Sequence, residues 1–273
     1  MSGLRPELIP AHRRALMLDH LKLRGAASIQ ELAIASGASP STVRRDLEHL
    51  EEQGFIERTH GGAMIQNSTP ASTFEPEASL AAHLARAEKK AIGRAAAASL
   101  RPGQSVIFDS GSTVLMAAQA AVERDIPLTA VTNDLGIGQV LAAASQIRLV
   151  VLGGTVRPGS LTLTGEPGQD FLKGLRADVA LVGVHAIADT SLSDTSIELA
   201  AMKRAMIAAA RHIVLLADSS KFQPAAFSRI CDISAVHELV TDEGAQASDV
   251  ARLRDLGLSV TLVRAEATAR RAA

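Results

Sequence analysis

A short segment that begins at Ser39 carries side chains suited to contact with double-stranded DNA. Ser39, Ser41 and Thr42 have hydroxyl groups that can donate hydrogen bonds to phosphate oxygens. Arg44 and Arg45 follow, and an arginine can hold either a phosphate or the O6/N7 edge of guanine through two hydrogen bonds. We therefore expect these five residues to contact the DNA backbone and to read bases.

The residues around these side chains predict the helix that presents them. Ser39 is a favourable N-cap, and Pro40 suits the first helical position because its missing N–H breaks no helical bond. From Val43 onward apolar residues recur at i, i+4 and i+7, which gives one buried stripe and leaves the arginines on the remaining surface. Gly54 supplies a stop. The segment is therefore predicted to be a short recognition helix.

The neighbouring sequence predicts two further helices and a hairpin. A helix over residues 11–24 precedes a second helix that Ser28 can cap, and a tight turn then leads into the recognition helix. Two short strands, at residues 55–58 and 63–65, complete a winged helix-turn-helix. The hairpin residues that we expect to touch the DNA backbone or the minor groove are Arg58 and His60.

Charge and composition limit how this head can bind nucleic acid. The 273-residue chain has a formal net charge of −1, and Glu48, Glu51, Glu52 and Glu57 lie close to the arginines in sequence. Arg44 can therefore also form an ordinary surface ion pair with Glu48. The chain contains no Trp or Tyr, which disfavours stacking of single-stranded bases. DNA contact must come from placed side chains rather than from bulk attraction.

A second group of small and polar residues follows a predicted strand in the larger part of the chain. The strand, at residues 105–109, leads into a predicted helix through a Ser-Gly-Ser-Thr turn. Glycine lets the backbone approach an anion closely, hydroxyl groups donate, and the helix amides favour negative charge. Such a turn also caps helices without any ligand. The residues that we assign to this candidate phosphate site are Asp109, Ser110, Gly111, Ser112 and Thr113.

Other predicted strands end in residues of the same kinds. Arg157 and Lys221 can neutralise a phosphate, while Asp109 and Asn133 can bond to sugar hydroxyls. A pair of glycines is more often a plain turn, and the segment from Asp218 can serve only as a cap. The further residues assigned to effector binding are Thr132, Asn133, Gly153, Gly154, Arg157, Asp218 and Lys221.

Short apolar runs alternate with amphipathic helical segments from residue 105 to residue 263. This alternation predicts an α/β domain whose sheet is mainly parallel and covered by helices on both faces. In such sheets ligands bind beyond the carboxyl ends of the strands, where the polar residues stand. We expect a DNA-binding domain over residues 1–66, a linker over 67–78 and an effector-sensing domain over 79–273.

Composition disfavours several kinds of site. Cys231 is the single cysteine, so the chain can form neither an internal disulfide nor a zinc site built on several thiolates. No apolar run is long enough to cross a membrane, which favours a cytoplasmic protein without a membrane partner. We expect no catalytic residues, no bound metal and no cofactor.

These motifs resemble the signatures of DeoR-type bacterial transcription regulators. The resemblance is carried by residues 31–33, 41–47, 50–51, Gly54 and 58–63 in the head, and by residues 109–113, 132–133, 153–154, 203–206, Asp218 and 220–222 beyond it. It implies a sensor domain related in fold to ribose-phosphate isomerases and CoA transferases, responding to a phosphorylated sugar or its metabolite. It also adds Glu198 and Lys203 to the expected effector site.

The residues and the resemblance together predict a sequence-specific regulator that binds a double-stranded DNA operator as a homo-oligomer, either a dimer or a tetramer. We expect it to repress a carbohydrate-utilisation operon until a phosphorylated sugar binds. One alternative is a sugar-phosphate isomerase with an accessory DNA-binding head; it is disfavoured because residues 183–189 replace the acidic cluster of such isomerases. A constitutive DNA-binding protein is another.

The loop at residues 192–194 departs from the pattern of the regulators, and this leaves the identity of the sugar open. His185 is interpreted either as a ligand contact or as a half-buried histidine near a strand end.

Overall fold

The computed structural model describes residues 9–66 and 77–265, which form two compact units. Within the described residues the division falls between Leu84 and Ala85, instead of the expected boundary after residue 78. The physical reason is helix α4 (Ala78–Ala81): Leu80 is buried in the core of the first unit and Leu84 packs against that core. Residues 67–76 of the expected linker lie outside the described residues.

The first unit is a winged helix-turn-helix, as predicted. Its elements before α4 are α1 (Pro10–Arg24), β1 (Ala26–Ser28), α2 (Ile29–Ser36), α3 (Pro40–Glu52), β2 (Ile56–Thr59) and β3 (Gly62–Ile65). The strands form an antiparallel sheet in the order β1-β3-β2. At Gly62 a Cβ atom would stand 2.0 Å from the carbonyl oxygen of Ala27, so β1 and β3 can pair there only with glycine.

Local sequence explains where the helices of this unit begin. Ser28 accepts a hydrogen bond from the amide of Glu31, and the Glu31 carboxylate accepts one from the amide of Ser28. Ser39 caps α3 by accepting from the amide of Thr42 at 3.3 Å, and a proline occupies the first turn. Both predicted N-caps are confirmed. Between the helices, Gly37 adopts the left-handed conformation that the tight turn requires.

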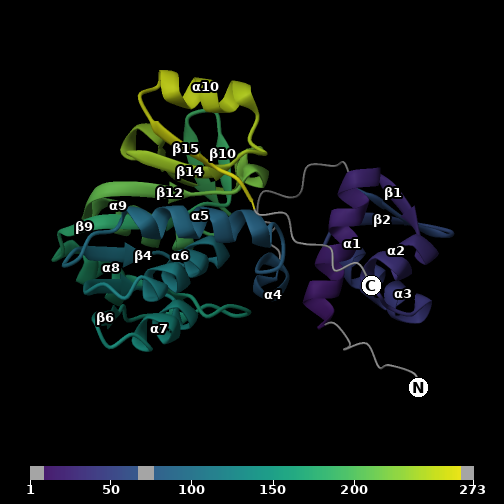
Figure 1. Ribbon diagram of the computed structural model, residues 1–273, viewed down its shortest axis with the longest axis horizontal. Coiled ribbons are helices and arrows are strands. Elements are labelled where there is room, and N and C mark those ends of the chain that lie inside the picture. Colours follow the sequence, from purple (N-terminus) through teal and green to yellow (C-terminus); the bar gives the residue numbers. More distant parts are fainter. Residues whose placement is uncertain (1–8, 67–76, 266–273) are drawn as a thin grey trace. The chain divides into compact units, whose positions relative to one another are not determined.

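The second unit contains seven parallel strands, ordered β15-β14-β12-β9-β4-β5-β6 (Figure 1). The strands of this sheet are β4 (Ser105–Phe108), β5 (Leu128–Thr132), β6 (Ile147–Val151), β9 (Ala177–Gly183), β12 (Ala210–Leu216), β14 (Glu238–Asp242) and β15 (Ser259–Val263). The helices are α5 (Arg86–Ser99), α6 (Ser112–Glu123), α7 (Leu135–Ala142), α8 (Glu166–Lys173), α9 (Ile197–Ala208) and α10 (Ala247–Asp255). The predicted parallel α/β class is confirmed.

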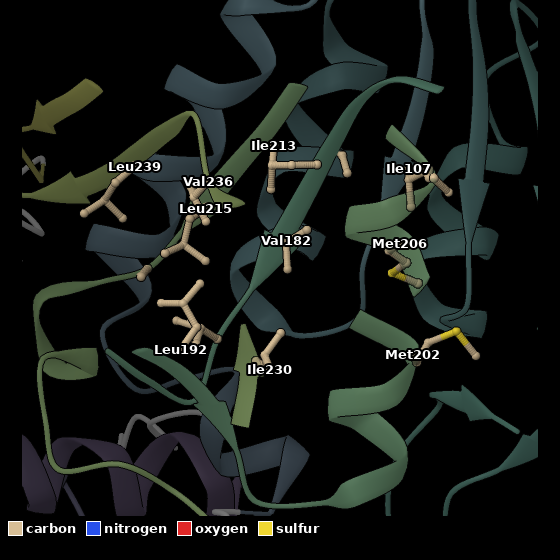
Figure 2. Close-up of a cluster of buried hydrophobic side chains, with 14 of the residues drawn as sticks. Ile107, Val182, Leu192, Met202, Met206, Ile213, Leu215, Ile230, Val236 and Leu239 are labelled. Atoms are coloured by element: carbon tan, nitrogen blue, oxygen red, sulfur yellow. The ribbon is translucent and has the colours of Figure 1, made fainter. Parts of the chain in front are cut away.

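Helices cover both faces of this sheet and bury a separate apolar cluster on each. Residues of α5, α6 and α7 pack on one face, against alternate side chains of β4 and its neighbours. Residues of α8, α9 and α10 pack on the other face. Figure 2 shows part of this second cluster, in which side chains of β4, β9, β12 and β14 share a core with Met202 and Met206 of α9. The two clusters hold the carboxyl ends of the strands in fixed register.

Several elements were not predicted. They are the hairpin β7 (Thr155–Val156) and β8 (Leu163–Thr164), the antiparallel sheet of β10 (Ala186–Ala188), β11 (Ser191–Asp194) and β13 (Ser228–Asp232), and helix α10. The helical segment between residues 78 and 99 is interrupted between α4 and α5. The interruption includes Ala85, which has a left-handed φ of 49°. Among the described residues no helix is long and apolar enough to cross a membrane.

Candidate DNA-binding surface and effector site

Helix α3 presents the predicted DNA-contacting residues on one side and its apolar stripe on the other. Val43, Leu47 and Leu50 are buried in the core of the head. Arg44 and Arg45 are exposed, and neither forms an ion pair or a side-chain hydrogen bond with another described residue. The alternative pairing of Arg44 with Glu48 is therefore absent from the described contacts. Both arginines are available to a partner.

The hydroxyl groups at the start of α3 contact one another. Ser39 Oγ lies 2.9 Å from Ser41 Oγ and 2.9 Å from Thr42 Oγ1. Because Ser39 Oγ also accepts from the Thr42 amide, this side chain acts first as a helix cap. Ser41 is exposed and Thr42 is half-buried at the same helix end. Here the amides and hydroxyls form a small donor group that faces away from the core.

The wing is tied to the recognition helix by an ion pair. The Arg58 guanidinium lies 3.3 Å from Glu48 Oε1, and the Arg58 amide donates to Glu51 Oε1 at 3.2 Å. His60 is exposed in the turn after β2. The glutamates therefore hold Arg58 against α3 in this structure and lower the positive charge of the surface.

A buried ion pair that was not assigned from sequence fixes the orientation of α3. Asp46 is 2% exposed, and its carboxylate lies 2.5 Å from Arg13 Nε and 3.0 Å from Arg14 Nε, both on α1. A buried carboxylate needs such partners. The available signal was an acidic residue directly before the buried Leu47, on the inner face of the predicted helix.

The larger unit brings the predicted effector residues to one edge of its sheet. All seven strands run parallel, so the residues that follow β4, β5, β6, β9 and β12 stand at the same edge. The chain passes from β4 outward through β5 to β6, whereas the later strands continue from β9 on the other side of β4. This reversal between β4 and β9 is the topological switch point, where open α/β sheets bind ligands.

Asp109 and Lys203 meet at the switch point. Lys203 Nζ lies 2.5 Å from Asp109 Oδ2 and 3.0 Å from the carbonyl oxygen of Gly183. The Gly183 amide donates to Asp109 Oδ2 at 3.0 Å. Burial raises the pKa of the Asp109 carboxyl, and the Lys203 ammonium with the amides of Ser110 and Gly183 offsets part of that rise. The predicted residues Asp109 and Lys203 thus form one buried charged pair.

One atom of Asp109 is left without a partner. Asp109 is 1% exposed, and its Oδ1 accepts no hydrogen bond from the described residues. Asn133, at the end of the adjacent strand β5, is fully buried and donates from Nδ2 to the carbonyl oxygen of Leu163. Asn133 Oδ1 is also unpartnered within the described structure. Such groups are costly to bury, so both atoms point to a missing donor.

The turn after β4 has the features expected of an anion site. Gly111 is the N-cap residue of α6 with a φ of 108°, and no side chain of the described residues caps the helix. The space where a Cβ would stand at Gly111 is empty to 4 Å. Ser110 and Thr113 are buried, and Ser112 is half-buried in the first turn. The first amides of α6 therefore lie beside an open approach for negative charge.

The next two strand ends are largely structural. Thr132 is fully buried, and its hydroxyl accepts from the Asp134 amide at 3.1 Å. After β6, a Cβ at Gly154 would stand 2.4 Å from the carbonyl oxygen of Thr164, so the β7–β8 hairpin requires glycine there. Gly153, one residue earlier, is exposed.

The β7–β8 hairpin places Arg157 beside the start of α9. Residues 155–158, 164, 196 and 198 line a shallow hollow of about 240 Å³. The Ser196 hydroxyl donates to the Glu198 carboxylate at 2.6 Å and, together with nearby Arg157, keeps the pKa of Glu198 below its ordinary value. Arg157 and Glu198 thus line the hollow together, whereas Asp109 is not among its lining residues.

Asp218 and Lys221 follow β12, which β9 separates from β4. Asp218 caps the short 3-10 helix Ser219–Lys221, and its carboxylate accepts hydrogen bonds from the amide and the hydroxyl of Ser220. This is the capping role that the sequence left open for the segment. Its Oδ2 atom has no partner among the described residues. Lys221 is half-buried at the end of this turn. These two residues form a second group along the same sheet edge.

Asp194 is a site residue that sequence reasoning did not assign. It ends β11 and is 5% exposed, and its Oδ2 lies 3.7 Å from Lys203 Nζ. His185 is half-buried near the end of β9, and its carbonyl oxygen accepts from Gln223 at 2.8 Å. The signal for Asp194 was its position in the loop that departs from the regulators' pattern. Across the described residues no cluster of three or more His, Cys, Asp or Glu side chains can hold a metal ion.

Comparisons with known proteins match both units. The family described as DeoR-like helix-turn-helix domain matches residues 13–69, and the family described as DeoR C terminal sensor domain matches residues 84–243. The chain belongs to the DeoR family. As a member of the DeoR family it is a DNA-binding transcriptional regulator rather than an enzyme.

Relatives of this DeoR-family chain align over nearly their whole lengths. The HTH-type transcriptional repressor CsqR of Escherichia coli is 33% identical over 94% of this chain and 97% of its own. The glycerol-3-phosphate regulon repressor of the same organism is 30% identical over 90% of this chain and 96% of its own. Among solved structures, ribose 5-phosphate isomerase A of Methanocaldococcus jannaschii is similar with a TM-score of 0.37 and 16% identity, covering 49% of this chain and 53% of that one.

Proposed function

We propose that this DeoR-family regulator represses a carbohydrate-utilisation operon and releases its operator when a phosphorylated sugar binds at the carboxyl edge of the parallel sheet. The observation that carries the proposal is a pair of buried acceptors, Asp109 Oδ1 and Asn133 Oδ1, that have no partner among the described residues. Asp109 also precedes helix α6, whose start no described side chain caps. Hydroxyl groups of a sugar supply donors for the acceptors, and a phosphate accepts from the α6 amides. The names of two relatives as repressors support the sign of regulation.

The DNA-binding surface requires more than one copy of the chain. One small head presents few base-reading side chains, and specific sites usually need the larger contact area of paired heads. We infer a homo-oligomer, dimer or tetramer, in which Arg44 or Arg45 reads a base in the major groove while the other holds phosphate. Linked heads raise affinity without any new contact.

Transmission of the signal involves helix α4 in this proposal. Leu80 is 1% exposed in the core of the head, so the segment that precedes α5 is part of the DNA-binding unit. An effector changes operator affinity only if it binds the DNA-incompetent arrangement more tightly, with a typical coupling of about 1–3 kcal/mol.

The proposal is tested by ligand binding to the full-length protein. Thermal-shift and calorimetric titration with a panel of phosphorylated sugars should identify at least one compound that raises the melting temperature. The matched unphosphorylated sugars should bind much more weakly, because they leave the α6 amides without an anion. If no phosphorylated sugar binds at millimolar concentration, the proposed effector class is wrong.

A further inference from the structure

Three buried charged residues of the described structure meet at the switch point, two of them acidic and one basic. Lys203 contributes one ammonium group, which Asp109 and Asp194 share at 2.5 Å and 3.7 Å. All three residues are at most 5% exposed. With both carboxylates ionised, these three residues carry one net negative charge, and burying an uncompensated charge is strongly unfavourable. The cluster therefore favours a further positive group.

The unpartnered atoms in the same place are all acceptors. Asp109 Oδ2 is occupied by Lys203 and the Gly183 amide, whereas Oδ1 has no partner among the described residues. Strands β4 and β5 pair Phe108 with Thr132, so Asp109 and Asn133 follow on adjacent strands. Asn133 Oδ1 is the second unpartnered acceptor. A group that satisfies this end of the site must donate hydrogen bonds.

A protonated primary amine meets both requirements. It carries one positive charge and three N–H donors, while a sugar hydroxyl carries no charge and donates once. Because Lys203 occupies Oδ2, an ammonium at Oδ1 would bond to the Asp109 oxygen that has no partner among the described residues. Charges of alternating sign would then follow one another through Asp194, Lys203, Asp109 and the ligand.

We propose that the effector is a phosphorylated amino sugar, whose ammonium group binds at Asp109 and Asn133 while its phosphate binds at the start of α6. Asp194 is then a specificity-determining residue, because it supplies the carboxylate that leaves the cluster negative. This inference rests on the proposed function, since it concerns the same site. It adds the chemical class of the ligand and a residue that selects it.

The test compares matched ligands on the full-length protein by isothermal titration calorimetry. The pairs are glucosamine 6-phosphate with glucose 6-phosphate, and galactosamine 6-phosphate with galactose 6-phosphate. In at least one pair the amine form should bind about tenfold more tightly or better, because a charge-assisted bond exceeds a neutral one by this order. Equal or tighter binding of the neutral sugar phosphates overturns the inference and leaves the proposed function intact. Absence of binding by all four compounds and the wider panel overturns both.

A charge-neutralising variant identifies the selecting residue. Asp194→Asn keeps an acceptor for the Thr195 amide, which bonds to Asp194 Oδ1 at 2.8 Å. In this variant the dissociation constants of the amino sugar phosphate and of the matched neutral sugar phosphate should become nearly equal. The variant should still bind both compounds through the phosphate. If Asp194→Asn does not fold, Asp194→Ser removes the same negative charge and is titrated with the same ligand pairs. An unchanged ratio in a folded variant overturns the role of Asp194.

The matched control is Asp189→Asn, in the neighbouring turn between β10 and β11. Its side chain is 94% exposed, and its φ of 48° suits asparagine. The control removes one negative charge outside the cluster. Its ratio of dissociation constants for the amine and the neutral sugar phosphate should equal that of the wild-type protein. A parallel fall in the control would show that bulk charge sets the preference, which also contradicts the inference.

Discussion

At the scale of single residues, two kinds of charged side chain in the head have opposite consequences. Arg44 and Arg45 are exposed, so replacement of either by alanine should leave the melting temperature nearly unchanged. Loss of the arginine that reads a base should weaken operator binding by about 1–3 kcal/mol and relax specificity at one position. Fluorescence anisotropy at fixed salt measures this. If both variants bind the operator like the wild type, the assignment is wrong.

Asp46 belongs to the second kind, because its carboxylate is buried between Arg13 and Arg14. Asp46→Ala leaves two arginines without their partner and should lower the free energy of unfolding of the head by about 3–5 kcal/mol. Urea denaturation measures the loss. Glu48→Ala, which removes an exposed carboxylate of the same helix, is the control and should change stability by less than about 1 kcal/mol. Equal effects would contradict the role given to burial.

Cys231 provides a simple chemical check of the second unit. Burial raises the pKa of its thiol to about 11, so the thiol stays protonated below pH 10. Iodoacetamide, which reacts with the thiolate, should therefore label the native protein slowly at pH 8 and the denatured protein rapidly. Mass spectrometry of timed samples distinguishes the two rates. Rapid native labelling at pH 8 would contradict the partial burial of Cys231 in β13, where it pairs with Leu192 of β11.

At the scale of elements, helix α4 packs on the head through the buried side chain of Leu80. Leu80→Ala removes a side chain that is 1% exposed and should cost about 2–5 kcal/mol in the stability of the head. Ser79→Ala, at an exposed neighbouring position, is the control. Scanning calorimetry of the full-length protein should show a lower transition for the first variant alone. Unchanged melting of both would place α4 outside the folded head.

Sequence predicted long elements and their caps well and short elements poorly. The caps at Ser28 and Ser39 depend on side chains within three residues, which the sequence displays directly. Strand β1 has three residues and shows no period, and its pairing depends on Gly62 far along the chain. The boundary before Ala85 could not be predicted, because it depends on where Leu80 packs.

The candidate effector site shows the same limit. The strand ends that carry Asp109 and Asn133 were recognisable from sequence because each follows an apolar run. Sequence did not reveal that Lys203 Nζ lies against Asp109, or that Asp194 approaches the same ammonium, since these residues come from α9 and β11. Such contacts follow from packing over long separations. Of the residues assigned to the site, Thr132 and Gly154 have structural roles that the turn geometry explains.

At the scale of the whole molecule, the account depends on coupling between the start of α6 and the operator-binding head. The decisive variant is Ser112→Asp. The helix dipole stabilises a carboxylate in the first turn of α6, so the variant should fold, but the same carboxylate repels a bound phosphate. Ser112→Asn is its neutral control. Both variants should fold and bind operator as the wild type does.

The most direct measurement is operator binding by the full-length protein, followed by anisotropy while a phosphorylated sugar identified in the thermal-shift screen is added. We predict that the sugar weakens operator binding of the wild type by about 5–150-fold. Ser112→Asp should lose this response, while Ser112→Asn should retain most of it. An operator affinity that ignores every bound sugar phosphate, or a full response in Ser112→Asp, would contradict control of DNA binding through this site.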